Sequence, residues 1–533
     1  MNINESVRPE MPDEMPASGI NAPKRAPDIR ETVFAWVFVI IGYIFCRSFP
    51  ISARPVGTLI FLIALYAAGG IFLFLTDAKQ TPRSAFCILT VFLFSSSLFI
   101  SSNEFIHFLS TSWALGCFMI WVMLSNGGGL EKKTGELLFY DAVKAVFVMP
   151  FVSFGRLFAS LIPRRENGTP RVKIGRQIAF ATLGILIAVI PTAMVTYLLS
   201  YNDDFNAMSS RVMQFISGDI LGRAASLLFA VPLAAYVFGA FASGIDRRYD
   251  KHMTADRCRS FSASLKFAPE TMACFAVLPL IAVYIIFFVS QWNYYVSAFF
   301  GRLPQDVDVY ARYASDGFMQ LCVVSGINAA IMLTVSVFTV RKRGDRHSIA
   351  TRAVIGLLSV CTLVLVATAI SKMVLYIKAY GLTRLRVYAS WFMLLIAAGF
   401  IVMLFKQIFP KIKVSCTLLA VFVVFFGVLA VSDPDGIIAN HNIDRYIDGT
   451  LEMPNANGIE YLVTECGDSA IPGIARLSHE LEQRGTNEKT KKAADEALRR
   501  WLENDAKERT WFYYGTLPKI KARIAASNAV KDS

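Results

Sequence analysis

Long apolar stretches constrain the fold of this chain more than any other feature of its sequence. Each is about 17–23 residues long, enough for a helix rising 1.5 Å per residue to cross a hydrocarbon core of about 30 Å. Backbone groups in lipid must bond within their own segment, so such stretches form helices. The sequence therefore predicts an all-α, polytopic transmembrane bundle of about eleven spans, near 32–49, 56–75, 84–100, 106–124, 178–199, 224–245, 272–290, 318–340, 353–371, 387–405 and 414–431.

Composition supports the same fold class. Apolar residues make up 55% of the 533 and charged residues 17%, whereas soluble domains have about 45–50% and about 25%. The mean hydropathy is +0.48. These values exclude a disordered chain, a collagen and a small disulfide scaffold. They leave open what the protein does.

The distribution of lysine and arginine predicts the orientation in the membrane. With the N-terminus inside, the cytoplasmic segments hold 29 of the 53 Lys and Arg, the opposite loops hold 10, and the remaining 14 follow residue 431. The net charge of the cytoplasmic segments equals the +13 of the whole chain. The basic excess is thus explained by membrane insertion, and no nucleic-acid partner is expected. We predict a multi-pass protein of the bacterial cytoplasmic membrane, with a cytoplasmic N-terminus and an extracytoplasmic C-terminus.

The spans divide the chain into five parts. Residues 136–162 mix apolar runs with charges and a proline, which predicts a cytoplasmic amphipathic segment with Arg156 near anionic lipid; a re-entrant hairpin is the alternative. Helical spacing of apolar residues after 432 predicts a small helical domain, with Asp468 capping the helix that contains Pro472. The predicted parts are a disordered cytoplasmic tail (1–31), four spans (32–124), the amphipathic segment (125–177), seven spans (178–431) and an extracytoplasmic helical domain (432–533).

Motifs for familiar chemistry are missing from the sequence. The nine cysteines form no C-x-x-C pair and no zinc spacing, and the five histidines are isolated from one another. The glycine run at 126–130 has no glycine directly before Lys133 and Thr134, which a phosphate loop requires. We therefore expect no cofactor, no metal and no catalytic residue of these classes. The function is expected to be non-enzymatic.

Specific-looking polar runs instead gather at the outer ends of the later spans. Here stand Q-x-x-Y (291–294), Y-A-x-x-G-F-x-Q-L (313–321), M-x-L-Y-x-x-A-Y-G-L-T-x-x-R (373–386), N-x-x-R-Y (442–446), Y-L (461–462) and D-x-A-x-P (468–472). Over roughly 135–475 these runs resemble bacterial integral membrane proteins known as domain of unknown function 4173, related to the 4153 group. Lys372 departs from the arginine of that pattern, and the last 50 or so residues match it poorly. The resemblance implies the topology but no activity.

The same runs yield a candidate outer-face site. Gly381 and Thr383 fit a helix end and a new helix start, which brings Lys378, Arg384 and Arg386 together. We hypothesise that these cations pair with nearby acids of the outer segments, which are Asp306, Asp308, Asp316, Asp433, Asp435 and Asp444; an aromatic belt with helix caps is the alternative. The candidate site comprises Gln291, Tyr294, Tyr313, Gly317, Tyr376, Tyr380, Gly381, Arg384, Arg386, Asp433, Asn442, Arg445 and Tyr446.

Three functions compete on this sequence. The first is an envelope scaffold or sensor that contacts the lipid bilayer and another membrane or envelope protein through its outer face. The second is a transporter of an uncharged or lipidic substrate, because prolines at 191, 232 and 279 interrupt three spans. The third is a membrane-embedded transferase, in which Asp433 and Asp435 would hold a divalent cation.

Overall fold

The computed structural model contains only helices among its regular elements, apart from one isolated β-bridge between Ala268 and Thr339 in the part described. The all-α prediction is confirmed. The structure describes residues 28–48, 55–131, 135–161, 202–216, 219–246, 253–290, 310–340, 348–452, 456–507 and 516–532, with single positions between 181 and 200 and at 292.

Within these residues, ten helical segments are long and apolar enough to cross a membrane. The chain is a multi-pass membrane protein, and these segments contact the lipid bilayer. The eleventh predicted span, 178–199, falls largely outside the described residues and stays a prediction. The crossing segments are α1 (Ile29–Ser48), α2 (Pro55–Leu75), α3 with α4 (Pro82–Ser95, Ser97–Ile100), α5 (Glu104–Ser125), α11 (Asp219–Asp246), α13 (Glu270–Ser290), α15 (Tyr310–Phe338), α16 (Ile349–Tyr380), α17 (Arg384–Ile408) and α18 (Val414–Val431).

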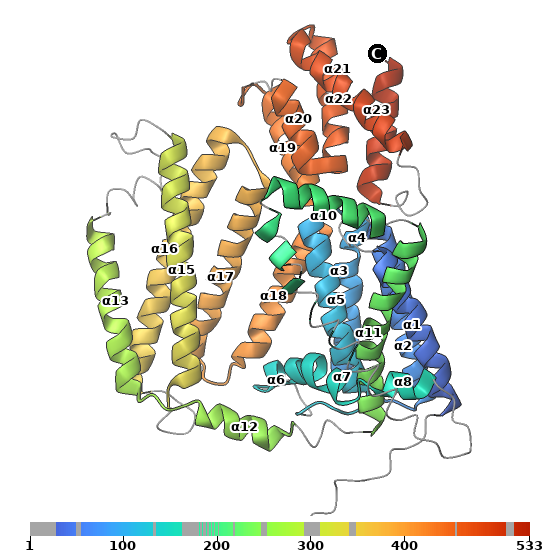
Figure 1. Cartoon of the computed structure of the whole chain (residues 1–533). Helices are drawn as coiled ribbons and strands as arrows, with labels where there is room; N and C mark the ends of the chain where they lie inside the picture. Colours follow the sequence, from blue (N-terminus) through green and yellow to red (C-terminus); the bar gives the residue numbers. More distant parts are fainter. Residues whose placement is uncertain are drawn as a thin grey trace, which may run out of the picture.

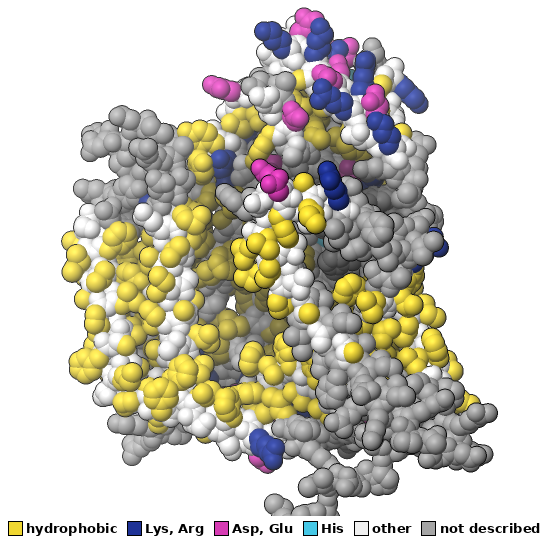
Figure 2. Space-filling model, in the orientation of Figure 1, with side chains coloured by type: hydrophobic (Ala, Val, Ile, Leu, Met, Phe, Trp, Pro, Cys, Tyr) yellow, Lys and Arg dark blue, Asp and Glu magenta, His cyan; other side chains and the backbone are white. Residues whose placement is uncertain are grey.

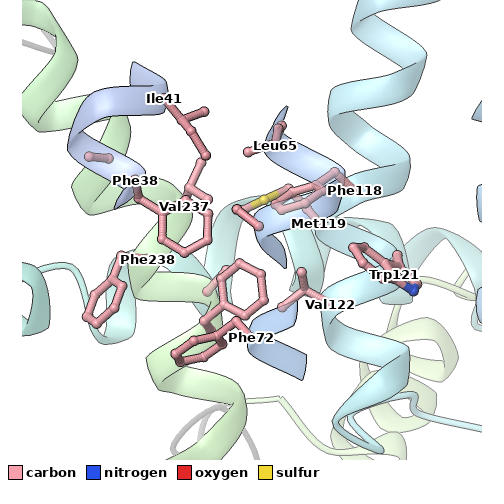
Figure 3. Packing of buried hydrophobic residues seen from close by; sticks show 14 of the residues in the cluster. Phe38, Ile41, Leu65, Phe72, Phe118, Met119, Trp121, Val122, Val237 and Phe238 are labelled. Atoms are coloured by element: carbon pink, nitrogen blue, oxygen red, sulfur yellow. The ribbon is translucent and has the colours of Figure 1, made fainter. Parts of the chain in front are cut away.

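A first bundle forms around aromatic side chains of α1, α2, α5 and α11 (Figure 3). Phe38 and Phe72 are each 1% exposed and Phe238 is fully buried. The Phe72 and Phe241 rings meet edge to face with centroids 5.0 Å apart. Since hydrophobicity gives little drive between helices in lipid, close packing of this kind holds the bundle.

A second bundle consists of α13, α15, α16 and α17, and a buried polar chain links three of these helices. The Tyr284 hydroxyl of α13 donates to Asn328 Oδ1 of α15 at 2.7 Å. Asn328 Nδ2 donates to Thr362 Oγ1 of α16 at 2.8 Å. Asn328 and Thr362 are fully buried. Interhelical hydrogen bonds thus add to packing here.

Replacing Asn328 by alanine should therefore destabilise the second bundle by about 1–2 kcal/mol, because it removes both interhelical bonds. Unfolding in mixed micelles measures the change. Ser325→Ala is the matched control, since among the described residues the Ser325 hydroxyl bonds only to the Leu321 carbonyl of its own helix. Equal effects of the two substitutions would contradict an interhelical role for Asn328.

Helix α18 lies between the two bundles (Figure 1). It packs against α3 and α5 of the first bundle and against α17 of the second. Phe426 of α18 meets Phe94 of α3 with ring centroids 4.6 Å apart. Trp391 of α17 donates to the Phe425 carbonyl of α18 at 3.0 Å. The two bundles are thus joined through α18.

Short elements lie across one end of the spans, opposite the C-terminal domain (Figure 1). They are α6 (Leu138–Val143), the π-helix η2 (Lys144–Val148), α7 (Met149–Val152), α8 (Arg156–Leu161) and α12 (Ala255–Ser264). The prediction that Arg156 lies near lipid headgroups is wrong. Its side chain is buried and donates to Glu31 at 2.9 Å, which ties this segment to α1.

The glycine run belongs to the same end and has a structural role. Lys144 Nζ donates to the Gly128 carbonyl at 2.9 Å, and the Leu130 amide donates to Asp141 at 2.8 Å. Arg83 bridges the Glu131 carbonyl and Asp141. The amides of Gly127, Gly128 and Leu130, which a phosphate loop would need to leave free, are bonded within the chain.

The C-terminal helices stack on one another beyond the C-terminal end of α18. They are α19 (Pro434–Ile447), α20 (Ala456–Cys466), the 3-10 turn η4 (Gly467–Ala470), α21 (Ile471–Arg484), α22 (Glu488–Lys507) and α23 (Leu517–Asp532). They share one core, and charged side chains cover them above the apolar belt of the spans (Figure 2). Asp468 does not cap α21, because the cap is Ala470. Asp468 instead accepts from Trp501 Nε1 at 2.9 Å.

Candidate functional site

The turn between α16 and α17 and the helix α19 form the centre of the candidate site. Gly381 has a φ of +76° and ends α16. The Thr383 hydroxyl accepts from the Arg386 amide and caps α17. Both predicted roles are confirmed. The turn is tight because only glycine adopts this φ without steric cost.

Asn442 of α19 holds this turn. Its side-chain oxygen accepts from the Leu382 amide at 2.7 Å, and its Nδ2 donates to the Leu382 carbonyl at 2.8 Å. An added Cβ on Gly381 would lie 2.5 Å from Asn442 Oδ1. The turn after α16 and the Asn442 side chain therefore fit together only when residue 381 is a glycine.

Arg445, one turn further along α19, covers the end of α16. Its guanidinium donates to the carbonyls of Ile377 at 2.9 Å and Lys378 at 2.6 Å. These are carbonyls of the last helical turn, of which that of Ile377 also accepts from the Gly381 amide at 2.9 Å, and the positive charge is favourable at a helix C-terminus. α19 thus fixes both the end of α16 and the turn that follows.

An ion pair with a fully buried carboxylate and a partly exposed guanidinium lies at the start of α19. Asp435 is 0% exposed and accepts two bonds from Arg384, at 2.8 Å from Nε and 2.7 Å from Nη2. Asn103 Nδ2 donates to both carboxylate oxygens at 3.1 and 2.9 Å. Asn103 also caps α5. One carboxylate of the C-terminal domain therefore joins both membrane bundles.

Asp433 makes the second link to the first bundle. Its Oδ1 accepts from Ser469 at 3.0 Å, and Ser469 lies 2.9 Å from the Ser102 hydroxyl. Asp433 adopts a left-handed conformation, with φ 43°, which is uncommon outside glycine. Burial raises the pKa of Asp433, and the Ser469 bond acts against this rise.

Arg386 does not pair with Asp433, contrary to the idea of one continuous ion-paired assembly. Its guanidinium carbon lies 4.0 Å from the Tyr376 ring centroid. Its Nη1 donates to the carbonyls of Tyr380 and Gly381. Among the acids proposed as partners, only Asp435 binds one of the three cations in the described residues, while Asp444 pairs with Arg476 at 2.7 Å.

The structure brings together only part of the predicted set. Tyr446 packs against the core of the C-terminal domain. Gln291 and Tyr294 lie outside the described residues, as do Asp306 and Asp308, and no side-chain position is described for Tyr313, Asp316 or Gly317. We call the contact between the C-terminal domain and the two membrane bundles the junction. The predicted residues that meet there are Tyr376, Tyr380, Gly381, Arg384, Arg386, Asp433, Asn442 and Arg445.

Sequence reasoning missed the contribution of the first bundle. Asn103, Ser102 and Ser469 complete the junction, but nothing in the spacing of the chain links residue 102 to residue 469. The one available signal was Asn103 directly before an apolar span, a pattern typical of a helix cap. Asp435 is one of the six acids that the sequence offers as partners, but it is not among the predicted site residues.

The junction offers no metal site in the described residues, where no group of three or more His, Cys, Asp or Glu could hold an ion. Both Asp435 oxygens already accept bonds from Arg384 and Asn103. Burial raises the pKa of the nearby Cys466 thiol to about 12, so it is not a thiolate at neutral pH. These observations favour a structural junction over divalent-cation or thiol chemistry.

Comparison with known families is consistent with this topology. Residues 86–477, most of the chain, match the family described as domain of unknown function (DUF4153). The chain belongs to this family. Membership in the 4173 group is not supported by the match and stays a prediction. No curated protein and no solved structure matches the chain significantly. The DUF4153 match includes Asn103, Arg384 and Asp435 but ends before α22 and α23, and it indicates no activity.

Proposed function

We propose that this DUF4153 protein is a non-enzymatic scaffold or sensor of the bacterial envelope, in which the C-terminal domain couples an outer partner to both membrane bundles. The observation that carries the proposal is the fully buried Asp435, held by Arg384 of one bundle and Asn103 of the other. A domain bound in this way can pass a load or a shift to both bundles at once. The junction is therefore suited to coupling.

The outward orientation is part of the proposal. The start of α1 and the end of α2 lie at one end of the spans, where Arg30 donates to the Leu75 carbonyl at 2.8 Å. The C-terminal domain lies at the opposite end (Figure 1). The excess of lysine and arginine in the N-terminal-side loops supports a cytoplasmic location for the first end.

The alternatives have less support. Transport was suggested by prolines that could break helices, but α11 continues through Pro232 and α13 continues through Pro279. A transferase using a cation on Asp433 and Asp435 is disfavoured because both Asp435 oxygens have other partners. Each alternative thus loses part of its support, while Pro191, the third such proline, lies in a span that falls largely outside the described residues.

Photo-crosslinking in intact cells tests the proposal. A benzoyl-phenylalanine is placed at His479 or Glu496, which are exposed on α21 and α22. Phe92 on the lipid-facing side of α3, 79% exposed, is the control position. We expect a discrete protein adduct from the two domain positions, and its loss when Arg384→Ala unseats the domain at unchanged protein level. Adducts no stronger than at Phe92, or adducts indifferent to Arg384→Ala, would contradict coupling through this domain.

A further inference from the structure

Arg386 is an unbalanced positive charge at the membrane boundary. It lies in the first turn of α17, which carries two arginines and no acidic residue. The positive end of the helix dipole disfavours cations there. Arg384 is compensated by Asp435 at 2.7 Å, whereas no carboxylate of the described residues lies within 4.0 Å of Arg386. A site with this charge favours an anion.

The Arg386 guanidinium is held in one orientation. The Tyr376 ring stacks on it at 4.0 Å, and the Tyr380 and Gly381 carbonyls accept from Nη1. Nε and Nη2 make no hydrogen bond to a described residue. An arginine fixed on one edge, with two donors remaining, is suited to binding phosphate oxygens.

Tyrosine hydroxyls accompany this guanidinium. Tyr380 packs edge to face on Tyr376 with centroids 5.3 Å apart, and it is 47% exposed. Tyr461 of α20 is 48% exposed and close enough to Arg386 and Arg384 for their charges to lower its pKa, although burial and Glu465 raise it overall. Neither hydroxyl bonds to a described residue. Both hydroxyls can donate to an anion at Arg386, while Glu465, one helical turn after Tyr461, lies on the same face of α20.

The surroundings place this group of side chains where lipid headgroups lie. Leu385 is 71% exposed and Phe392 is 51% exposed, and their spacing of two helical turns puts them on one face of α17. Below the turn this face is open to acyl chains, while the C-terminal domain with Tyr461 lies above it. An amphiphile could therefore place its chains along α17 and its headgroup at Arg386.

We propose that Arg386, Tyr380 and Tyr461 bind the phosphate ester of an anionic lipid headgroup. The inference deepens the proposed function, on whose outer-face site it rests, by naming a ligand class for that site. A soluble phosphate would use the same donors. Lipid is favoured because α17 exposes apolar side chains beside the site, from Leu385, the residue before Arg386, to Phe392 two helical turns further into the membrane.

Native mass spectrometry of the full chain tests the site. The protein is released from nanodiscs that contain phosphatidylglycerol and phosphatidylcholine, and the retained lipids are counted. We expect Arg386→Gln to lower phosphatidylglycerol affinity about tenfold, because bonds to charged groups are the strong ones. Tyr380→Phe, which removes only an exposed hydroxyl, should lower it by about two- to threefold. Arg476→Gln on the C-terminal domain is the control and should change nothing.

The arms separate the possible outcomes. Equal retention in wild type, Arg386→Gln and Tyr380→Phe overturns the proposal, as does equal retention of the two lipids by wild type. If Arg386→Gln does not fold, the Tyr380→Phe result alone decides. Inorganic phosphate that displaces the lipid at millimolar concentration, with the same dependence on Arg386, would assign the site to a soluble anion. The lipid count does not depend on protein adducts at His479 or Glu496, so this test and that of coupling fail separately.

Discussion

Replacing Arg384 by alanine is expected to destabilise the junction by about 3–5 kcal/mol, because it leaves the Asp435 carboxylate buried without its cation. Asp435 is 0% exposed and takes its two shortest bonds from Arg384, at 2.8 and 2.7 Å. Without Arg384, the Asp435 carboxylate keeps only the side-chain amide of Asn103 as a described donor. We expect the loss to appear as faster hydrogen exchange in α19 and at the start of α5, and as a lower midpoint of chemical unfolding.

The matched control for this result is Arg476→Ala on the C-terminal domain. Arg476 pairs with Asp444, also on α19, at 2.7 Å, but the two side chains are 45% and 53% exposed. Exposed pairs contribute about 0–1 kcal/mol. Combining Arg384→Ala with Asp435→Ala should recover part of the loss, since no charge is then left buried alone. Equal effects of Arg384→Ala and Arg476→Ala would show that burial does not govern this pair.

The second large effect is expected from Gly381→Ala, at about 2–4 kcal/mol. A side chain at a φ of +76° costs about 1–2 kcal/mol. The added Cβ would also lie 2.5 Å from Asn442 Oδ1. Asn442 would have to move and would lose its bonds to Leu382, each worth about 0.5–1.5 kcal/mol. Thermal unfolding of the purified chain measures the sum.

Gly449 offers the control that separates strain from clash. It has a φ of +71°, but an added Cβ would meet nothing within 4 Å. Gly449→Ala should therefore show only the backbone cost, about 1–2 kcal/mol. If Gly381→Ala cost no more than Gly449→Ala, the contact between the turn and Asn442 would not constrain the junction.

Composition and periodicity predicted the membrane helices well. The predicted span 414–431 coincides with α18, and Gly381 with Thr383 marks the end of α16 and the start of α17. Helix α16 extends beyond the C-terminal end of the predicted span 353–371, because it continues to Tyr380. Polar residues in its last turns lowered the apolar signal, although Lys372 and Met373 are buried against other helices.

The candidate site was predicted only where its residues are close in sequence. Gly381, Arg384 and Arg386 lie between residues 381 and 386. Local rules for helix ends and caps were therefore enough to predict that they lie close together. Asp435, the partner of Arg384, was one of six acids that the sequence alone could not rank. Arg156 shows the opposite error, because a cation in an amphipathic run was expected at lipid and instead binds Glu31.

The sequence by itself determined that this is a multi-pass helical membrane protein, because burial in lipid requires long apolar helices and leaves their length and composition visible in the chain. It also determined the turn at Gly381, since that conformation depends on local residues. Only the tertiary structure decided that Asp435 joins both bundles and that Arg386 has no acidic partner among the residues that the structure describes. Such pairings depend on which helix ends meet in space, and a carboxylate selects its cation by distance and burial rather than by spacing along the chain.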